Sequence, residues 1–508
     1  MQNILLTGGR IFAGLGWDVP SWYDSLLIKD GKIASIGSAA ALNSINNSVD
    51  LIQLNGALVL PGLCDAHIHL MVGGQSLQIL NLEGLDRKSV HQVLLNHAKT
   101  LDGSHSHWIK AFNWEPWRCD LDADFLDSIF PGRNVVVFAK DLHSCCCSST
   151  LLSLAGITRE LSDPPGWIIV RDVNGFPNGI LREGAAEKIH SILPPPTTDE
   201  IKYAILKAQD YLLSLGLTAV SEVLDKVNEH IYRSLDDENK LKIDIDAWLR
   251  IENWEIGTPP PHDGKRFRLN TLKLFLDGSL GSRTAALNEP YLDDPDHSGV
   301  LFYTDEELYD IALPAVEAGW RLAIHSIGDR AVAQACKLFK RLPRVPTGPH
   351  RIEHAQVLPE DGVRMIVESG AVASVQPVHL IDDQRWLPPR IGAERCKRTS
   401  IWRSLFEAGV PLALGSDWPV ASPDPLLNIH AAINRCGFNG EPSDDFELIE
   451  SLPPYLAIRA ATYGWAYATG LSDKRGSIAP GQSADLTIIS GVSDDLHDWS
   501  KAKVVKFQ

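Results

Sequence analysis

Eight short apolar segments recur along the chain, and amphipathic helical patterns separate most of them. The segments span residues 58–69, 217–222, 244–250, 271–277, 321–325, 350–354, 371–376 and 410–417. Two of the intervening helices begin with capping boxes, Thr197-x-x-Glu200 and Thr304-x-x-Glu307, and both patterns end near a glycine. Because a strand followed by a helix, repeated, builds a parallel sheet, these units predict an α/β fold, a (β/α)8 TIM barrel.

The rest of the chain predicts additions to this barrel, which we assign to residues 58–467. The interval from about 75 to 195 is too long for one crossover helix, so we interpret it as a large insertion after the first strand. An insertion at the end of a barrel that carries the chemistry is expected to form part of the pocket. Residues 1–57 and 468–508 contain short strands and turns without metal-ligand candidates.

Composition limits the partners of this chain. Of 508 residues, 44% are hydrophobic and 22% charged, which is typical of a soluble globular protein. The formal net charge of −17 argues against nucleic acid and anionic membranes, which bind basic surfaces. We see no apolar stretch of the roughly 18 to 20 residues that span a bilayer, and no secretory signal. Eight cysteines without Cys-x-x-Cys spacing favour reduced thiols, so we expect a cytoplasmic protein.

The first apolar segment ends in His67-Ile68-His69. Side chains of a strand alternate between its two faces, so the two histidines point the same way and could chelate one metal ion. A pair of surface histidines near a turn is the alternative, and the short motif alone does not decide between them.

Lys273 lies in a segment with strict alternation, in which leucines at 272, 274 and 276 form one face and Lys273, Phe275 and Asp277 form the other. A lysine that points into a protein interior is costly unless it is paired, neutral or modified. An ion pair with Asp277 is the simplest alternative for this residue.

Three further ligand candidates close later strands: His325, His354 and Asp417. Taken singly, each is better explained as a hydrogen-bonded histidine or as an aspartate that caps a helix or turn. Together with His67, His69 and Lys273 they place all six candidates at the C-terminal ends of strands 1, 4, 5, 6 and 8. Barrel enzymes keep their chemistry at that end, so the six residues predict a metal centre.

Five motifs resemble the amidohydrolase superfamily, in particular its YtcJ-like branch, amidohydrolase family 3, which includes N-substituted formamide deformylases. The motifs are residues 60–69 (LPGLCDAHIH), 274–287 (LFLDGSLGSRTAAL), 324–331 (IHSIGDRA), 351–356 (RIEHAQ) and 415–419 (GSDWP). The resemblance implies that the two chain ends combine into one small β-sandwich. It also implies that His143 is a pocket histidine, although Asp141-Leu142-His143 departs from the Asp-Gly-His of the family.

The resemblance implies one or two divalent metal ions, with zinc as the first choice and iron or manganese as alternatives. His67, His69 and Asp417 would hold a buried ion, and His325 and His354 a second. In the family, the lysine that matches Lys273 is often carboxylated and bridges two ions. An unmodified Lys273 would favour one ion. Glu183 is a rival acidic ligand that ranks below Lys273.

The implied reaction is hydrolysis of a non-peptide C–N bond in a small amide, N-acyl or N-formyl compound, with Asp417 as the proton-transfer residue. Lactone or ester hydrolysis, deamination and a catalytically silent binding or signalling barrel stay open, as does thiol chemistry at residues 145–147. A homodimer is compatible with the resemblance. The candidate substrate-binding residues are Trp114, His143, Arg283, Gln376, His379 and Trp418; for the tryptophans, core packing is the alternative.

Overall fold

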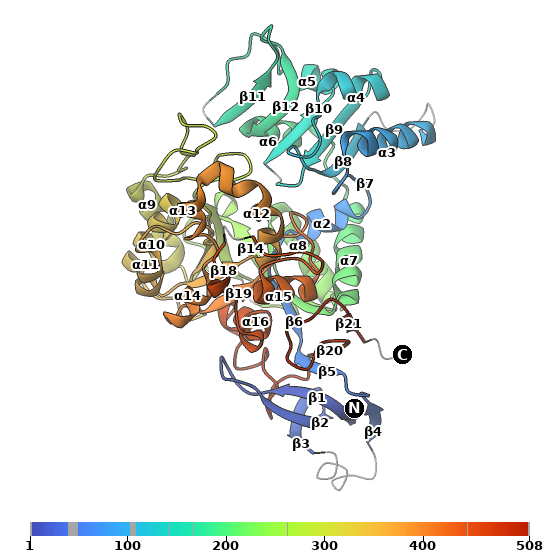
Figure 1. The fold of residues 1–508 in the computed structure, drawn as a ribbon, viewed down its shortest axis with the longest axis vertical. Coiled ribbons are helices and arrows are strands. Elements are labelled where there is room, and N and C mark those ends of the chain that lie inside the picture. Colours follow the sequence, from blue (N-terminus) through green and yellow to red (C-terminus); the bar gives the residue numbers. More distant parts are fainter. Residues whose placement is uncertain are drawn as a thin grey trace. The chain divides into compact units, whose positions relative to one another are not determined.

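The computed structural model describes residues 3–38, 49–101, 108–141, 143–164, 166–261, 263–443 and 446–505. The chain divides into two compact units. The first comprises Met1–Leu70, Gln209–Asp277 and Ala285–Gln508, and the second comprises Met71–Ala208 and Gly278–Thr284. Figure 1 follows the chain through both units.

The first unit contains an eight-stranded parallel sheet, in the order β19-β18-β17-β16-β15-β14-β13-β6. In chain order its strands are β6 (Leu63–Ile68), β13 (Leu217–Leu224), β14 (Asp244–Arg250), β15 (Phe267–Phe275), β16 (Arg321–Ser326), β17 (Arg351–His354), β18 (Val372–Val375) and β19 (Leu412–Leu414). The predicted barrel fold is confirmed, and each predicted segment supplies a barrel strand. The first segment nevertheless forms two strands, because Gly62 interrupts the strand between β5 (Leu58–Pro61) and β6.

The first and last strands meet along a seam of hydrogen bonds. The amide of Asp417 donates to the carbonyl of His67, and the amide of His69 donates to the carbonyl of Trp418, both at 2.7 Å. A side chain at Gly415 would bring its Cβ within 2.8 Å of the His67 nitrogen, so the close approach of the two chains requires glycine there. The seam therefore holds both ends of the predicted ligand set in register.

Helices of the first unit follow the barrel strands (Figure 1). They are α8 (Lys226–Asp237), α9 (Asp305–Glu317), α10 (Asp329–Arg341), α11 (Gly362–Ser369), α12 (Pro377–Ile391), α13 (Ala393–Cys396), α14 (Trp402–Glu407), α15 (Pro425–Asn434), α16 (Pro454–Ala460) and α17 (Tyr463–Ala468), with 3-10 turns η1 (Ile251–Asn253) and η2 (Leu448–Glu450). The predicted capping box at Thr304 is present, since its hydroxyl accepts from the amide of Glu307 and the Glu307 carboxylate accepts from the Thr304 amide. Over the described ranges, no helix has the length and apolar character needed to cross a membrane.

The two chain ends share a seven-stranded sheet in the first unit. Its strands are β1 (Ile4–Ala13), β2 (Ser21–Lys29), β3 (Lys32–Gly37), β4 (Asp50–Gln53), β5, β20 (Leu486–Ser490) and β21 (Lys503–Val504). β20 pairs antiparallel with β5, and the side chains of Val59 and Ile488 pack into one core with residues of β1 to β3. Segments from the two ends of the chain therefore combine in one sheet, and the bounds given for a composite β-sandwich stay a prediction.

The second unit has a six-stranded mixed sheet of its own, in the order β11-β12-β10-β9-β8-β7. The strands are β7 (Leu80–Asn81), β8 (Trp108–Trp114), β9 (Asn134–Ala139), β10 (Ser144–Cys147), β11 (Trp167–Arg171) and β12 (Pro177–Glu183). The helices are α2 (Leu70–Ser76), which begins at the last residue of the first unit, α3 (Arg87–Thr100), α4 (Ala123–Ile129), α5 (Ser149–Leu154), α6 (Gly184–Ile192) and α7 (Thr198–Ser214), which continues into the first unit. The strand-like runs predicted at 108–114 and 135–138 are β8 and β9.

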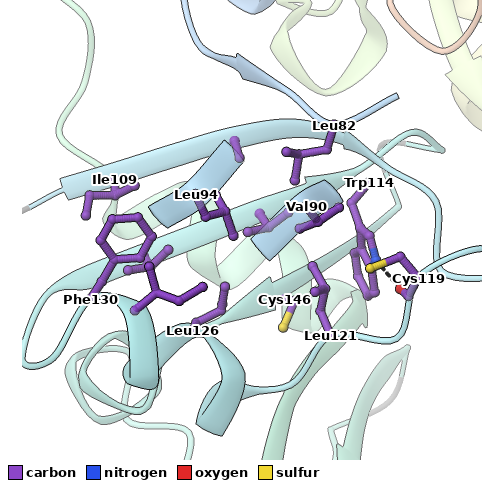
Figure 2. Close-up of a cluster of buried hydrophobic side chains, with 14 of the residues drawn as sticks. Leu82, Val90, Leu94, Ile109, Trp114, Cys119, Leu121, Leu126, Phe130 and Cys146 are labelled. Carbon is purple, nitrogen blue, oxygen red and sulfur yellow. Dashed lines mark hydrogen bonds between the residues drawn. The ribbon is translucent and has the colours of Figure 1, made fainter. Parts of the chain in front are cut away.

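Alternate residues of the central strands fill two separate cores, one on each face of this sheet. Val135, Val137 and Cys146 pack with α3 and α4 in the cluster of Figure 2, whereas Cys145 and Cys147 pack with α5 and α6. All three thiols are fully buried. Burial raises the pKa of Cys146 and Cys147 well above the ordinary range. A buried thiol with a raised pKa is a poor nucleophile, which argues against thiol chemistry here.

Trp114 is the largest side chain of the cluster in Figure 2, where its indole N–H donates to the carbonyl of Cys119 at 2.6 Å. It is 1% exposed. Truncation to alanine would leave a large cavity, so we expect Trp114→Ala to lower the free energy of unfolding by about 3–5 kcal/mol. Trp117 is 48% exposed, and we expect Trp117→Ala to change the free energy of unfolding by about 0.5 kcal/mol or less. Denaturant unfolding of both variants checks this, and equal effects would contradict it.

Candidate metal centre

The structure brings the six predicted ligand side chains together in the first unit. His67 and His69 lie at the end of β6, Lys273 in β15, His325 in β16 and His354 at the end of β17. Asp417 follows β19 by three residues. All of them lie at the C-terminal ends of the strands because the parallel strands of the barrel share one direction.

Asp417 and Lys273 approach the first histidine pair. Asp417 Oδ1 lies 3.2 Å from His69 Nε2 and 3.6 Å from His67 Nε2. Lys273 Nζ lies 3.4 Å from the same His67 nitrogen. Lys273 therefore lies next to the histidines. The alternative, an ion pair between Lys273 and Asp277, is not what the structure shows. Asp277 instead accepts backbone hydrogen bonds from Ala286, Ile327 and Gly328.

The other two histidines complete the cluster. The ring of His354 lies 5.1 Å from that of His67, and the ring of His325 lies 4.5 Å from that of His354, measured between centroids. His67, His354 and Asp417 each offer a ligand atom, and these atoms all lie within 4.8 Å of one another. Two imidazoles and a carboxylate are a common donor set for zinc and related divalent ions.

Asp417 gives a test of whether these residues fit a metal ion. Its carboxylate is buried, and Oδ1 receives no aligned hydrogen bond from any residue that the structure describes, despite the nearby rings of His67 and His69. A buried carboxylate oxygen without a donor is costly unless a cation lies next to it. Ring nitrogens of His67 and His69, which can ligate a metal, lie within 3.6 Å of that oxygen. The residues therefore fit a divalent ion.

The electrostatics keep these groups in the protonation states that bind metals. Burial, together with the charge of Lys273, lowers the pKa of His67 to about 4, so its imidazole is neutral at pH 7. Burial alone would raise the pKa of Asp417, but the neighbouring histidines hold it well below its usual range. Burial also lowers the pKa of Lys273 to about 8. A neutral imidazole and an ionised carboxylate are the forms that coordinate metal.

Two of the candidate ligands have a strained backbone. The φ angles are 74° at His354 and 59° at Asp417, in the left-handed region that residues with a side chain rarely adopt. Such conformations cost about 1–3 kcal/mol each and concentrate at functional sites, where the surrounding structure enforces them. This observation agrees with a functional role for both residues.

Sequence reasoning missed two acidic residues that contact the histidines from behind. Glu353 Oε2 lies 2.8 Å from His67 Nδ1, and Asp277 Oδ1 lies 3.5 Å from His325 Nε2. Glu353 is fully buried. Burial alone would raise its pKa, but the adjacent Arg351 holds it at about 2. The available signal was a pair of opposite charges, Arg351 and Glu353, on one face of a short apolar strand.

Three of the predicted substrate-binding residues lie in the first unit. Gln376 is buried, and its Oε1 lies 2.9 Å from His354 Nδ1. His379 Nε2 lies 3.0 Å from the carbonyl of Ser416, and its ring is 6.5 Å from that of His354. Trp418 is buried, and its ring contacts Tyr211. Gln376 thus orients a candidate ligand, and substrate contact by all three stays a prediction.

The other three predicted substrate residues, and the rival ligand Glu183, lie in the second unit. Trp114 occupies the core position described above, which agrees with the packing alternative. His143 Nδ1 lies 3.1 Å from Glu183 Oε2, and Glu183 Oε1 accepts from the hydroxyl of Thr284 at 2.7 Å. Arg283 has a left-handed φ of 61°. Glu183 therefore has partners within its own unit, and it is not one of the three residues that the described structure groups as a metal site.

A comparison with protein-family models decides the family. The model described as "Amidohydrolase family" matches residues 50–506, which include the barrel strands and all six ligand candidates. The chain belongs to the amidohydrolase family.

Relatives of this amidohydrolase match almost the whole chain. "Protein LONG AFTER FAR-RED 3" of Arabidopsis thaliana is 31% identical over 97% of this chain and 88% of its own length. "Putative amidohydrolase YtcJ" of Bacillus subtilis is also 31% identical, over 92% of this chain and 91% of its own length. The crystal structure of an uncharacterized metal-dependent hydrolase from Pyrococcus horikoshii is 28% identical, covers 98% of this chain and 99% of its own, and superimposes with a TM-score of 0.79. The predicted YtcJ-like resemblance is confirmed.

Proposed function

We propose that this amidohydrolase is a metal-dependent enzyme that hydrolyses a non-peptide C–N bond of a small amide, N-acyl or N-formyl compound. The observation that carries the proposal is the group formed by His67, His354 and Asp417, whose ligand atoms lie within 4.8 Å of one another. The name of the Pyrococcus horikoshii structure, a metal-dependent hydrolase, supports the metal. Zinc is the proposed ion because imidazole and carboxylate ligands suit it.

The residues of the chain divide the work of hydrolysis between them. His67, His69, Lys273, His325, His354 and Asp417 would hold one or two ions. A bound divalent ion supplies Lewis acidity that lowers the pKa of water and polarises a carbonyl. Asp417 has two carboxylate oxygens, so one can ligate while the other accepts the proton of the attacking water and returns it to the leaving amine. Asp417 is ionised at pH 7, which is the form in which a carboxylate can take up a proton.

Lys273 decides the number of ions. Its lowered pKa of about 8 leaves a substantial fraction of the amine neutral near pH 7 to 8, and a neutral amine is the form that reacts with carbon dioxide. We expect the wild type to hold close to two ions per chain and Lys273→Ala to hold one or none. Elemental analysis of protein purified without chelator measures this. One ion per chain that is unchanged by the substitution would contradict a carboxylated bridge.

The proposed setting of the enzyme follows from the chain as a whole. A small-molecule substrate suits the acidic net charge of −17, which disfavours nucleic acid and anionic membranes. All eight cysteines lie in the described part of the chain, where they are buried and form no disulfide. Reduced thiols in that number agree with a reducing compartment, so we propose the cytoplasm.

A substrate panel tests the proposed reaction. Metal-depleted protein is supplied with zinc and assayed on N-formyl amines, N-acyl amino acids, simple amides, lactones, esters and aminopyrimidines, with His67→Ala/His69→Ala as the control. We expect amide or N-acyl hydrolysis that needs zinc and is absent from the control. Turnover of lactones, esters or amines alone would reject the C–N amide assignment, and bound metal without any turnover would favour the silent barrel.

A further inference from the structure

A buried row of charged residues lies behind the metal-ligand candidate His67. The Arg351 guanidinium donates from Nε to Glu353 Oε1 at 2.7 Å and from Nη2 to Oε2 at 3.3 Å. Glu353 Oε2 in turn lies 2.8 Å from His67 Nδ1. The exposed fraction is 0% for Glu353 and 1% for Arg351 and His67. These three side chains therefore interact with one another and not with solvent.

We propose that Glu353 is a positioning residue that sets the tautomer of His67. An ionised carboxylate can only accept hydrogen bonds, so the single proton of the neutral imidazole is drawn to Nδ1. Nε2 is then left with its lone pair, and it is Nε2 that faces Lys273 Nζ at 3.4 Å and Asp417 Oδ1 at 3.6 Å. The Nδ1–H bond does not point straight at the carboxylate, although the two atoms lie within hydrogen-bonding distance at 2.8 Å. This inference rests on the proposed metal site.

Arg351 keeps Glu353 in the form that this role needs. A guanidinium is always protonated and can only donate, so it holds the carboxylate ionised and fixes its orientation. Arg351 is itself anchored, because Nη2 donates to the carbonyl of Ala66 at 2.7 Å and to the hydroxyl of Ser374 at 2.9 Å, and the guanidinium lies 4.4 Å from the ring centroid of Trp248. Arg351 and Glu353 therefore form a rigid support behind His67.

This arrangement makes Glu353→Gln a sharp test, although the two side chains have nearly the same shape. Arg351 must donate, so it will take the single carbonyl oxygen of the new amide. The NH₂ group then faces His67 Nδ1 and can only donate to it. That contact draws the imidazole proton to Nε2, which blocks the nitrogen that faces Asp417. A merely structural glutamate would tolerate this isosteric change far better.

A second variant, which also removes the guanidinium, is expected to reverse the change in the His67 tautomer. In Arg351→Met/Glu353→Gln the obligatory donor is gone, so the amide can turn its oxygen toward Nδ1 and restore the original tautomer. Removing both charges of a buried pair is also better tolerated than removing one, which keeps the double variant foldable. Glu450→Gln is the matched control, since Glu450 is another buried glutamate, with bonds to Ser404.

Zinc affinity of the metal-depleted proteins, measured by competition with a coloured chelator, is the readout, together with the absorption spectrum of the cobalt-substituted forms. Loss of the supporting hydrogen bond to a ligating histidine typically costs about 10–100-fold in affinity. We expect Glu353→Gln to lose that much, the double variant to regain part of it, and the control to match the wild type.

Two results would overturn the inference while zinc still binds to the wild type. One is wild-type affinity and an unchanged cobalt spectrum in Glu353→Gln. The other is a loss of zinc affinity in Glu353→Gln that the double variant shares fully. That result would indicate a structural effect that does not depend on the tautomer of His67. Failure of the wild type itself to bind zinc would instead count against the proposed function.

Discussion

Replacing Asp417 by asparagine is expected to lower kcat by about 10²–10⁴-fold, the usual contribution of a residue that transfers protons in the transition state. The amide keeps the shape of the carboxylate but cannot accept and return a proton. It also offers a neutral oxygen at the point where Asp417 Oδ1 lies within 3.6 Å of both His67 Nε2 and His69 Nε2. The measurement is kcat on the best substrate of the panel, with metal content determined in parallel.

Asp424→Asn is the matched control for this experiment. Asp424 caps helix α15 by accepting from the amide of Leu426 at 2.9 Å. Asparagine caps helices about as well as aspartate, so stability and kcat should stay close to the wild type. An Asp417→Asn enzyme with nearly full kcat would show that another residue transfers the proton.

A loss of stability as large as that of Trp114→Ala is expected from Asp246→Ala, inside the barrel. Asp246 Oδ1 accepts from Arg321 Nη2 at 2.9 Å, and its Oδ2 accepts from the indole N–H of Trp248 at 2.8 Å. Asp246 and Arg321 are both fully buried. Removing the carboxylate leaves a buried guanidinium without its counter-charge, which typically costs about 3–5 kcal/mol. Denaturant unfolding followed by circular dichroism measures this loss.

An exposed ion pair in the same unit provides the comparison. Lys242 Nζ lies 3.2 Å from Asp210, and the two side chains are 64% and 61% exposed. Water and salt screen such a pair, so Asp210→Ala should change the free energy of unfolding by less than about 1 kcal/mol. A loss from Asp246→Ala as small as that would mean that water reaches Arg321 in the folded protein.

The barrel could be predicted because each of its strands has a local apolar pattern in the sequence. Lys273 lies in β15 between alternating leucines, and His325 and His354 each end a short apolar run. Parallel strands that share one direction then bring distant residues to one end, so the ligand cluster followed from the strand count. The break at Gly62 was missed, because a continuous apolar run does not show that its first half, β5, pairs with β20 in another sheet.

Residues whose role depends on tertiary contacts were not predictable. Glu353 contacts His67, which is 286 positions earlier in the chain (353 − 67). The charge pair with Arg351 was visible in the sequence, but no local pattern shows which histidine Glu353 contacts. Trp114 was a candidate for substrate binding because it ends a strand-like run in the predicted insertion, yet its indole lies in a hydrophobic core. An aromatic residue at a strand end carries the same sequence signal in both roles, and only packing distinguishes them.

Elemental analysis of metal per chain, in protein purified without chelator, tests the central claim most directly. The measurement is made on the wild type and on His67→Ala/His69→Ala, both after growth with added zinc. The metal-centre account predicts at least one divalent ion per chain in the wild type and almost none in the double variant, with both proteins folded. A folded wild type without metal under zinc supplementation, or a double variant that keeps the full metal content, would contradict it.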